Sequence, residues 1–142
     1  MATPLFAYSL FVSYSKNVPS AQRIPYTTGA ALTGEVLSRL ARQIPDGWIT
    51  MVQMEDETSE NSLVADFRDG WATVYVVREV EHYFELLNSE DPGGDELLNI
   101  TGNGPTPKKH ATRDLSLMAE IIAHFARTGQ PFPGCRWEES NP

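Results

Sequence analysis

The segment from Asp114 to Glu138 constrains the fold of this chain more than any other stretch. Its apolar residues recur at spacings of three and four, the period that places side chains along one stripe of an α-helix. These residues are Leu117, Met118, Ile121, Ile122 and Phe125. Asp114 or Ser116 can cap the start of this helix by accepting a backbone N–H group, and Gly129 tolerates a left-handed cap at its end. The pattern therefore predicts a core-facing helix with two defined ends.

A short closing strand is expected after this helix. The stretch from Gln130 to Gly134 contains two prolines, which cannot continue the helix, so it must run extended. The following residues alternate, and this places Cys135 and Trp137 on the same face of a strand that runs to Glu139. Cys135 is the single cysteine, which excludes an internal disulfide, and we expect it to act as a small buried apolar residue.

The N-terminal third of the chain predicts one strand and one helix. Residues 5–14 are apolar and aromatic, which indicates a strand buried on at least one side, and we expect it to lie centrally in a sheet. From Thr28 to Gln43 the apolar residues share one helical stripe. Gly34 weakens the start of this pattern, so the helix is also compatible with a later start, with Thr33 as its cap.

The middle of the chain predicts strands in succession. Residues 48–55 alternate well enough for a strand, and two β-rich runs, residues 62–67 and 71–80, are joined by a glycine-containing connection that favours a hairpin. In the second of these runs, one face carries small apolar residues and is expected to meet a helix layer, while the other is aromatic and is expected to be partly solvated or covered by a loop. The small-residue face consists of Ala72, Val74 and Val76, and the aromatic face of Trp71, Thr73, Tyr75 and Val77.

The remaining stretch is less regular. Residues 81–88 fit either a strand or a short helix, residues 97–101 predict a strand, and residues 102–107 predict an irregular connection rich in glycine and proline. A length of 142 residues suits one hydrophobic core. Together the elements predict an α+β fold: a single domain, residues 1–142, with a mainly antiparallel sheet of six or seven strands packed against two main helices.

Negative charge is concentrated in the middle of the chain. Residues 55–96 hold thirteen carboxylates and two arginines, a net charge of −11, whereas the remaining residues carry +3, which gives −8 for the whole chain. Such a field repels phosphate backbones, so direct binding to nucleic acid is not expected, and it favours a basic partner. The chain has no run of 18 apolar residues and no apolar leader, so we expect it to work in the cytoplasm without a membrane contact.

Motifs for catalysis and cofactors are missing from the sequence. His82, His110 and His124 lack the spacing and the neighbours of a metal site. Gly102 and Gly104 form a turn-like phrase without the lysine and serine or threonine of a phosphate-binding loop. No ordered serine, histidine and acid set is present. We therefore expect neither an enzyme nor a protein that holds a metal or cofactor.

The C-terminal order of helix, Thr-Gly stop, proline turn and tryptophan strand resembles the signature end of a known protein family. The residues that carry it are Phe125, Thr128, Gly129, Pro131 and Trp137. This order is similar to that of family one of the bacterial polymorphic-toxin immunity proteins, over about 25 residues. Pro133 departs from the family pattern. Elsewhere only the order of strands agrees.

This resemblance implies a protein that binds and neutralises a secreted toxin domain, often one that acts on nucleic acid. Because such a toxin has a basic active-site groove, acidic residues of the inhibitor can take the place of phosphates, with aromatic anchors beside them. The candidate partner-binding residues are Glu55, Asp56, Glu57, Glu60, Glu79, Glu81, Tyr83, Asp91, Asp95 and Glu96. The alternative is an adaptor or chaperone-like module for a secreted partner, which would share the same acidic, single-domain character.

Overall fold

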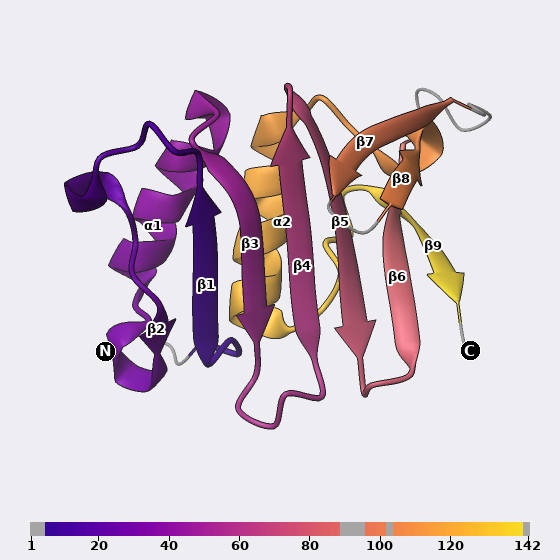
Figure 1. Ribbon diagram of the computed structural model, residues 1–142. Helices are drawn as coiled ribbons and strands as arrows, with labels where there is room; N and C mark the ends of the chain where they lie inside the picture. The colour runs from indigo at the N-terminus through magenta and orange to yellow at the C-terminus, as the bar shows by residue number, and fades with distance from the viewer. Residues whose placement is uncertain (1–4, 89–95, 102–103, 141–142) are drawn as a thin grey trace.

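Seven antiparallel strands form the main sheet, and two α-helices cover one of its faces (Figure 1). The computed structural model describes residues 5–88, 96–101 and 104–140. The strand order is β2-β1-β3-β4-β5-β6-β9. The bounds are Ser9–Tyr14 for β1, Thr27–Thr28 for β2, Ile49–Glu55 for β3, Ser62–Arg68 for β4, Trp71–Arg78 for β5, His82–Leu87 for β6 and Arg136–Ser140 for β9. This architecture confirms the predicted α+β class with its mainly antiparallel sheet and two main helices.

Both helices begin and end at residues that the sequence marks. Helix α1, Gly34–Gln43, is capped by Thr33, whose side chain accepts the N–H of Val36 at 3.3 Å. Helix α2, Leu115–Thr128, is capped by Asp114, which accepts the N–H of Leu117 at 3.0 Å. Gly129 ends α2 in the left-handed conformation, with φ of 73°. The structure thus selects Thr33 and Asp114 among the predicted caps.

The core lies between the sheet and the helices, and alternation along the strands decides which side chains enter it. In β5, Ala72, Val74 and Val76 are at most 1% exposed and face the helices, as predicted. Fully buried residues of α2, among them Met118 and Phe125, pack into the same cluster. The opposite side of the sheet, here called the front face, carries the aromatic residues of β5 and is partly solvated, also as predicted.

A small second sheet lies over part of the front face. Strands β7, Leu97–Thr101, and β8, Gly104–Pro107, pair with each other, and β7 contacts β4 and β5. In Figure 1 this hairpin crosses the upper part of β5. The short 3-10 helix η4, Lys108–His110, follows it, and Thr73 of β5 donates its hydroxyl to the His110 carbonyl at 2.7 Å. One end of the front face is therefore covered and the other is open.

Two predictions about strands were wrong, and one open alternative is resolved. Strand β1 is not central, because only the two-residue β2 separates it from the edge of the sheet; its aromatic run includes Tyr8 and Phe11, which are exposed at the surface. Residues 104–107 form a strand despite their prolines, which an edge strand tolerates because it need not donate every N–H. Residues 82–87, for which a helix was also considered, form β6.

The predicted closing strand is present as β9, and the structure pairs it with β6. Trp137 lies opposite Leu86 and packs on the core while remaining half-exposed, and its indole N–H donates to the Phe132 carbonyl at 2.8 Å. Cys135 lies just before the strand and is also half-buried. Burial raises the pKa of the Cys135 thiol to about 11, so the thiol stays protonated near neutral pH and behaves as an apolar group.

Candidate functional site

The structure brings together six predicted acids at one end of the sheet. The loop between β3 and β4, residues 56–61, and the turn between β5 and β6, residues 79–81, lie side by side at the lower end in Figure 1. The N–H of Val80 donates to the Glu60 carbonyl at 2.9 Å, and the N–H of Glu79 donates to the Asn61 side-chain oxygen at 3.0 Å. We call this region the acidic end; its carboxylates belong to Glu55, Asp56, Glu57, Glu60, Glu79 and Glu81.

Cations do not neutralise the acidic end. Within the described residues, none of its six carboxylates forms an ion pair. Arg78 is near in sequence, but its guanidinium points to the helix side, where it donates to the Gly129 carbonyl at 2.8 Å and lies 5.4 Å from the Phe6 ring centroid. Glu57, Glu60, Glu79 and Glu81 are exposed, so their charges face solvent and any approaching partner.

The turn that presents Glu79 and Glu81 has an unusual backbone. Glu79 and Val80 both adopt left-handed conformations, with φ of 56° and 69°. A β-branched residue rarely adopts this region, and each such residue costs about 1–3 kcal/mol. The two hydrogen bonds from the neighbouring loop hold the turn in place. Glu79, which the sequence pattern assigned to a strand of residues 71–80, therefore lies with Glu81 in the turn between β5 and β6.

Asp56 organises its own loop. Its carboxylate accepts hydrogen bonds from the Thr58 hydroxyl at 3.0 Å, the Asn61 amide side chain at 2.8 Å and the Asn61 backbone N–H at 3.3 Å. Burial alone would raise the pKa of this carboxyl, but the hydrogen bonds from Asn61 and Thr58 outweigh it and lower the pKa. Because its oxygens accept hydrogen bonds within the loop, the main role of Asp56 is to hold the loop in shape. Its charge is less available to a partner than the charges of the exposed glutamates.

Two other described candidates lie elsewhere. Tyr83 stands opposite Val77 in the β5–β6 register, near the acidic end and on the front face, half-buried. Glu96 pairs with Lys108 at 3.3 Å, and Lys108 also lies over the Trp71 ring at the opposite end of β5. A strand rises about 3.3 Å per residue, so the two ends of β5 are roughly 23 Å apart. Glu96 is thus separate from the acidic end, and Asp91 and Asp95 lie outside the described residues.

Exposed aromatic side chains on the front face were not among the predicted site residues. Phe11 and Tyr75 are 44% and 38% exposed there, and Tyr26 beside β1 is 63% exposed. Phe11, Tyr26 and Glu55 line one groove of about 290 Å³. Exposed aromatic rings are enriched in protein-binding surfaces, and carboxylates beside them complement the charge of a basic partner. The sequence does indicate these residues, because alternation places aromatic side chains on one face of a strand. Alternation alone does not tell which part of that face other segments leave uncovered.

Asp66 is a half-buried acid within this front face. Asp66 lies opposite Met51 and Thr73 on the neighbouring strands. Among the described residues, no group donates a hydrogen bond to its carboxylate or forms an ion pair with it. Burial raises its pKa. Burial also raises the pKa of the Tyr75 phenol, and the nearby Asp66 carboxylate and Tyr83 side chain raise it further. The front face therefore carries a negative charge that has no counterion among the residues that the structure describes.

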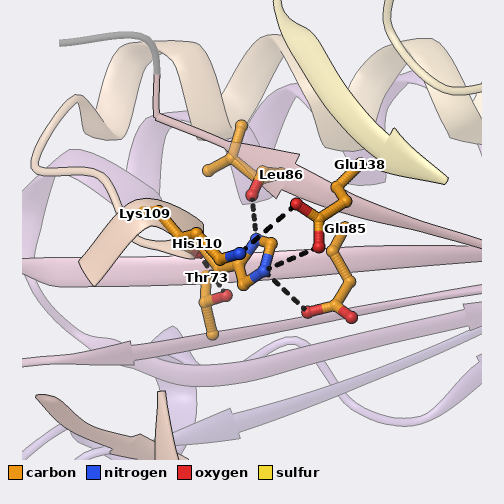
Figure 2. Close-up of polar contacts among 6 residues, drawn as sticks. All are labelled: Thr73, Glu85, Leu86, Lys109, His110 and Glu138. Atoms are coloured by element: carbon orange, nitrogen blue, oxygen red, sulfur yellow. Dashed lines mark hydrogen bonds and ion pairs between the residues drawn. The ribbon is translucent and has the colours of Figure 1, made fainter. Parts of the chain in front are cut away.

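A cluster of polar side chains surrounds His110 at the covered end of the sheet. Figure 2 shows the His110 ring with Nδ1 2.9 Å from the Leu86 carbonyl and Nε2 3.6 and 3.8 Å from the carboxylates of Glu138 and Glu85. Nδ1 must carry a proton, because a carbonyl oxygen only accepts. Lys109 also pairs with Glu138, at 3.5 Å. His110 is 5% exposed, and its contacts connect η4 with β6 and β9.

A cavity larger than the Phe11–Tyr26 groove lies at the same covered end, away from the acidic end. It has a volume of about 630 Å³, and Trp71 forms one wall with Lys108 and Arg113 lying 5.7 and 5.0 Å from its ring centroid. Asp114, the cap of α2, is also in the lining. Among the described residues, no group of three or more histidine, cysteine, aspartate or glutamate side chains could hold a metal ion.

Comparison with known proteins gives no relative: no family model, curated protein or solved structure matches the chain. The resemblance to the immunity proteins stays a prediction that rests on the C-terminal residues alone. Among the described residues, no helix combines the length and the apolar character that crossing a membrane requires.

Proposed function

We propose that this protein is an immunity protein that binds and neutralises a secreted bacterial toxin domain, without turnover of its own. The observation that supports this most is the acidic end, where two connections of the sheet meet beside an open aromatic face and where the carboxylates form no ion pair with any described residue. The C-terminal resemblance points to the same class of protein. On this proposal the chain acts in the cytoplasm of the cell that makes the toxin.

The acidic end suits a toxin that acts on nucleic acid, such as a nuclease or deaminase. The substrate of such an enzyme carries one negative charge per phosphate, so its binding groove is basic. Carboxylates placed near that groove attract it over several ångströms and raise the association rate, while aromatic side chains supply the contact area. Glu57, Glu60, Glu79 and Glu81 are exposed and free for this role.

Co-expression with the toxin domain encoded beside the gene for this chain tests the proposal. The unaltered protein is expected to restore growth and to bind the purified toxin domain. The double variant Glu57→Lys/Glu60→Lys is expected to slow association at least about tenfold at low salt, because electrostatic steering is lost. Both positions are exposed, so the fold should be unchanged.

A matched control separates local charge from total charge. Asp46→Lys/Glu120→Lys changes the net charge by the same amount at exposed positions outside the acidic end, in η3, Ile44–Asp46, and in α2. Its association rate should stay close to that of the unaltered protein. Equal slowing by both double variants would contradict a specific acidic surface. A bound toxin that remains active would identify an adaptor or chaperone instead.

A further inference from the structure

A groove on the front face lies between the edge of the sheet and the acidic end. Ser9 pairs with Glu55, and Phe11 pairs with Gln53, so these four side chains share the front face. The β1–β2 register pairs Leu10 with Thr27, and continuing it by one residue sets Tyr26 opposite Phe11. The resulting groove of about 290 Å³ is lined by Ser9, Phe11, Tyr26, Gln53 and Glu55. The rings of Phe11 and Tyr26 therefore flank the groove, and the Glu55 carboxylate lies at its rim.

The chain leaves this groove uncovered and negatively charged. Tyr26 and Phe11 are 63% and 44% exposed, which is unusual for large rings that could have packed inside. The Gln53 amide donates to the Glu55 carboxylate at 3.2 Å and fixes it at the rim. None of the lining residues is basic. The carboxylate thus lacks a cationic partner within the groove.

We propose that this groove binds an arginine side chain of a basic partner protein, with its guanidinium between the rings of Phe11 and Tyr26 and paired with Glu55. This inference rests on the proposed function and names the chemistry of its contact. Charge complementarity supports it, because the groove adjoins the acidic end: Glu55 is the last residue of β3, directly before the acidic loop.

Arginine fits the groove better than lysine does. Its planar guanidinium stacks on aromatic faces and at the same time donates two parallel hydrogen bonds to a carboxylate. A lysine ammonium is a compact, strongly hydrated charge that gains less from stacking. A neutral or acidic side chain would leave the Glu55 charge unpaired. The groove should therefore discriminate between two cations of the same charge.

The direct test is an NMR titration of the ¹⁵N-labelled full chain with tetra-arginine, tetralysine and tetraglutamate peptides. With tetra-arginine, shift changes should concentrate on the amides of the groove residues. Tetralysine should bind about three- to fivefold more weakly, and tetraglutamate should not bind. Substituting Glu55→Gln or Tyr26→Leu should weaken tetra-arginine binding by a similar factor.

The control variant is Glu120→Gln, which removes one exposed charge from α2, outside both the groove and the acidic end. Its affinity for tetra-arginine should change less than twofold. Equal affinity for both cationic peptides, equal loss in Glu55→Gln and Glu120→Gln, or no binding would overturn the arginine site. Because no toxin is present, these results do not bear on neutralisation, and failure of growth rescue with an intact groove response would overturn only the proposed function.

Discussion

Two aspartates, Asp56 and Asp66, show how the same side chain has opposite roles in this fold. The Asp56 carboxylate accepts hydrogen bonds from Asn61 and Thr58, which lower its pKa although partial burial opposes this. The Asp66 carboxylate is half-buried in the front face, and burial raises its pKa. The Asp56 charge therefore stabilises its loop, whereas the Asp66 charge lowers the free energy of unfolding.

Asp66→Asn is therefore expected to raise the free energy of unfolding near neutral pH. A carboxyl whose folded-state pKa is raised binds its proton more tightly in the folded protein, so the cost is present above that pKa and disappears below the unfolded value of 3.8. Urea denaturation at about pH 7 and about pH 2.5 measures this, and the gain should be lost at the lower pH.

The control for this prediction is Asp56→Asn, for which the opposite sign is expected. Its pKa is lowered in the folded protein, so its stabilisation is present above the unfolded value of 3.8 and is lost as the pH falls through the folded value. Asp56→Asn should destabilise near neutral pH and have little effect at low pH. A destabilising effect of Asp66→Asn near neutral pH would contradict the account of an unpaired buried charge.

At the scale of elements, the residues that define helix ends and strand alternation could be predicted from the sequence. Thr33, Asp114 and Gly129 act through local geometry, which sequence spacing fixes. The position of β1 near an edge could not be predicted, because pairing partners depend on distant segments. The sequence pattern did not predict the strand of residues 104–107, because prolines argue against a strand. Here they are tolerated because the strand pairs only with β7 and is an edge strand.

Gly129→Ala tests the cap of α2. At φ of 73° an added Cβ would lie 2.3–2.5 Å from atoms of the Phe6 ring, so the ring must move. We expect a loss of about 2 kcal/mol or more, from left-handed strain together with displaced packing. Thermal or urea denaturation provides the measurement.

Gly47→Ala is the matched control, since Gly47 has φ of 74° with no atom within 4 Å of the added Cβ. It should lose only the conformational part, about 1 kcal/mol. Similar losses in both variants would mean that the Phe6 contact contributes nothing.

Two substitutions of Trp137, in the closing strand β9, are expected to lower the free energy of unfolding by different amounts. Trp137→Phe keeps most of the ring against the core but removes the hydrogen bond to Phe132, which should cost about 1 kcal/mol. Trp137→Ala also removes the packing and should cost about 2–3 kcal/mol, less than for a fully buried ring. Urea denaturation of both variants measures the difference; equal losses would show that the ring does not pack on the core.

At the scale of the whole molecule, the excess of negative charge could be predicted from the sequence, but its arrangement could not. The acids of residues 56–61 and 79–81 meet because β3, β4, β5 and β6 are successive antiparallel neighbours, which returns both connections to one end. The same topology carries Glu96 to the opposite end, beside Lys108. The groove between Phe11 and Tyr26 depends on the β1–β2 pairing, which sequence pattern did not indicate.

The most direct test of the proposed partner-binding surface is hydrogen–deuterium exchange of this chain, free and bound to the toxin domain that the proposed function implies. We predict that binding protects the backbone amides of residues 56–61 and 79–81, with added protection at Tyr26 next to the groove. The amides around the Trp71 cavity at the covered end should exchange as in the free protein. Protection centred on that cavity or on the helices, with the acidic end unchanged, would contradict the account.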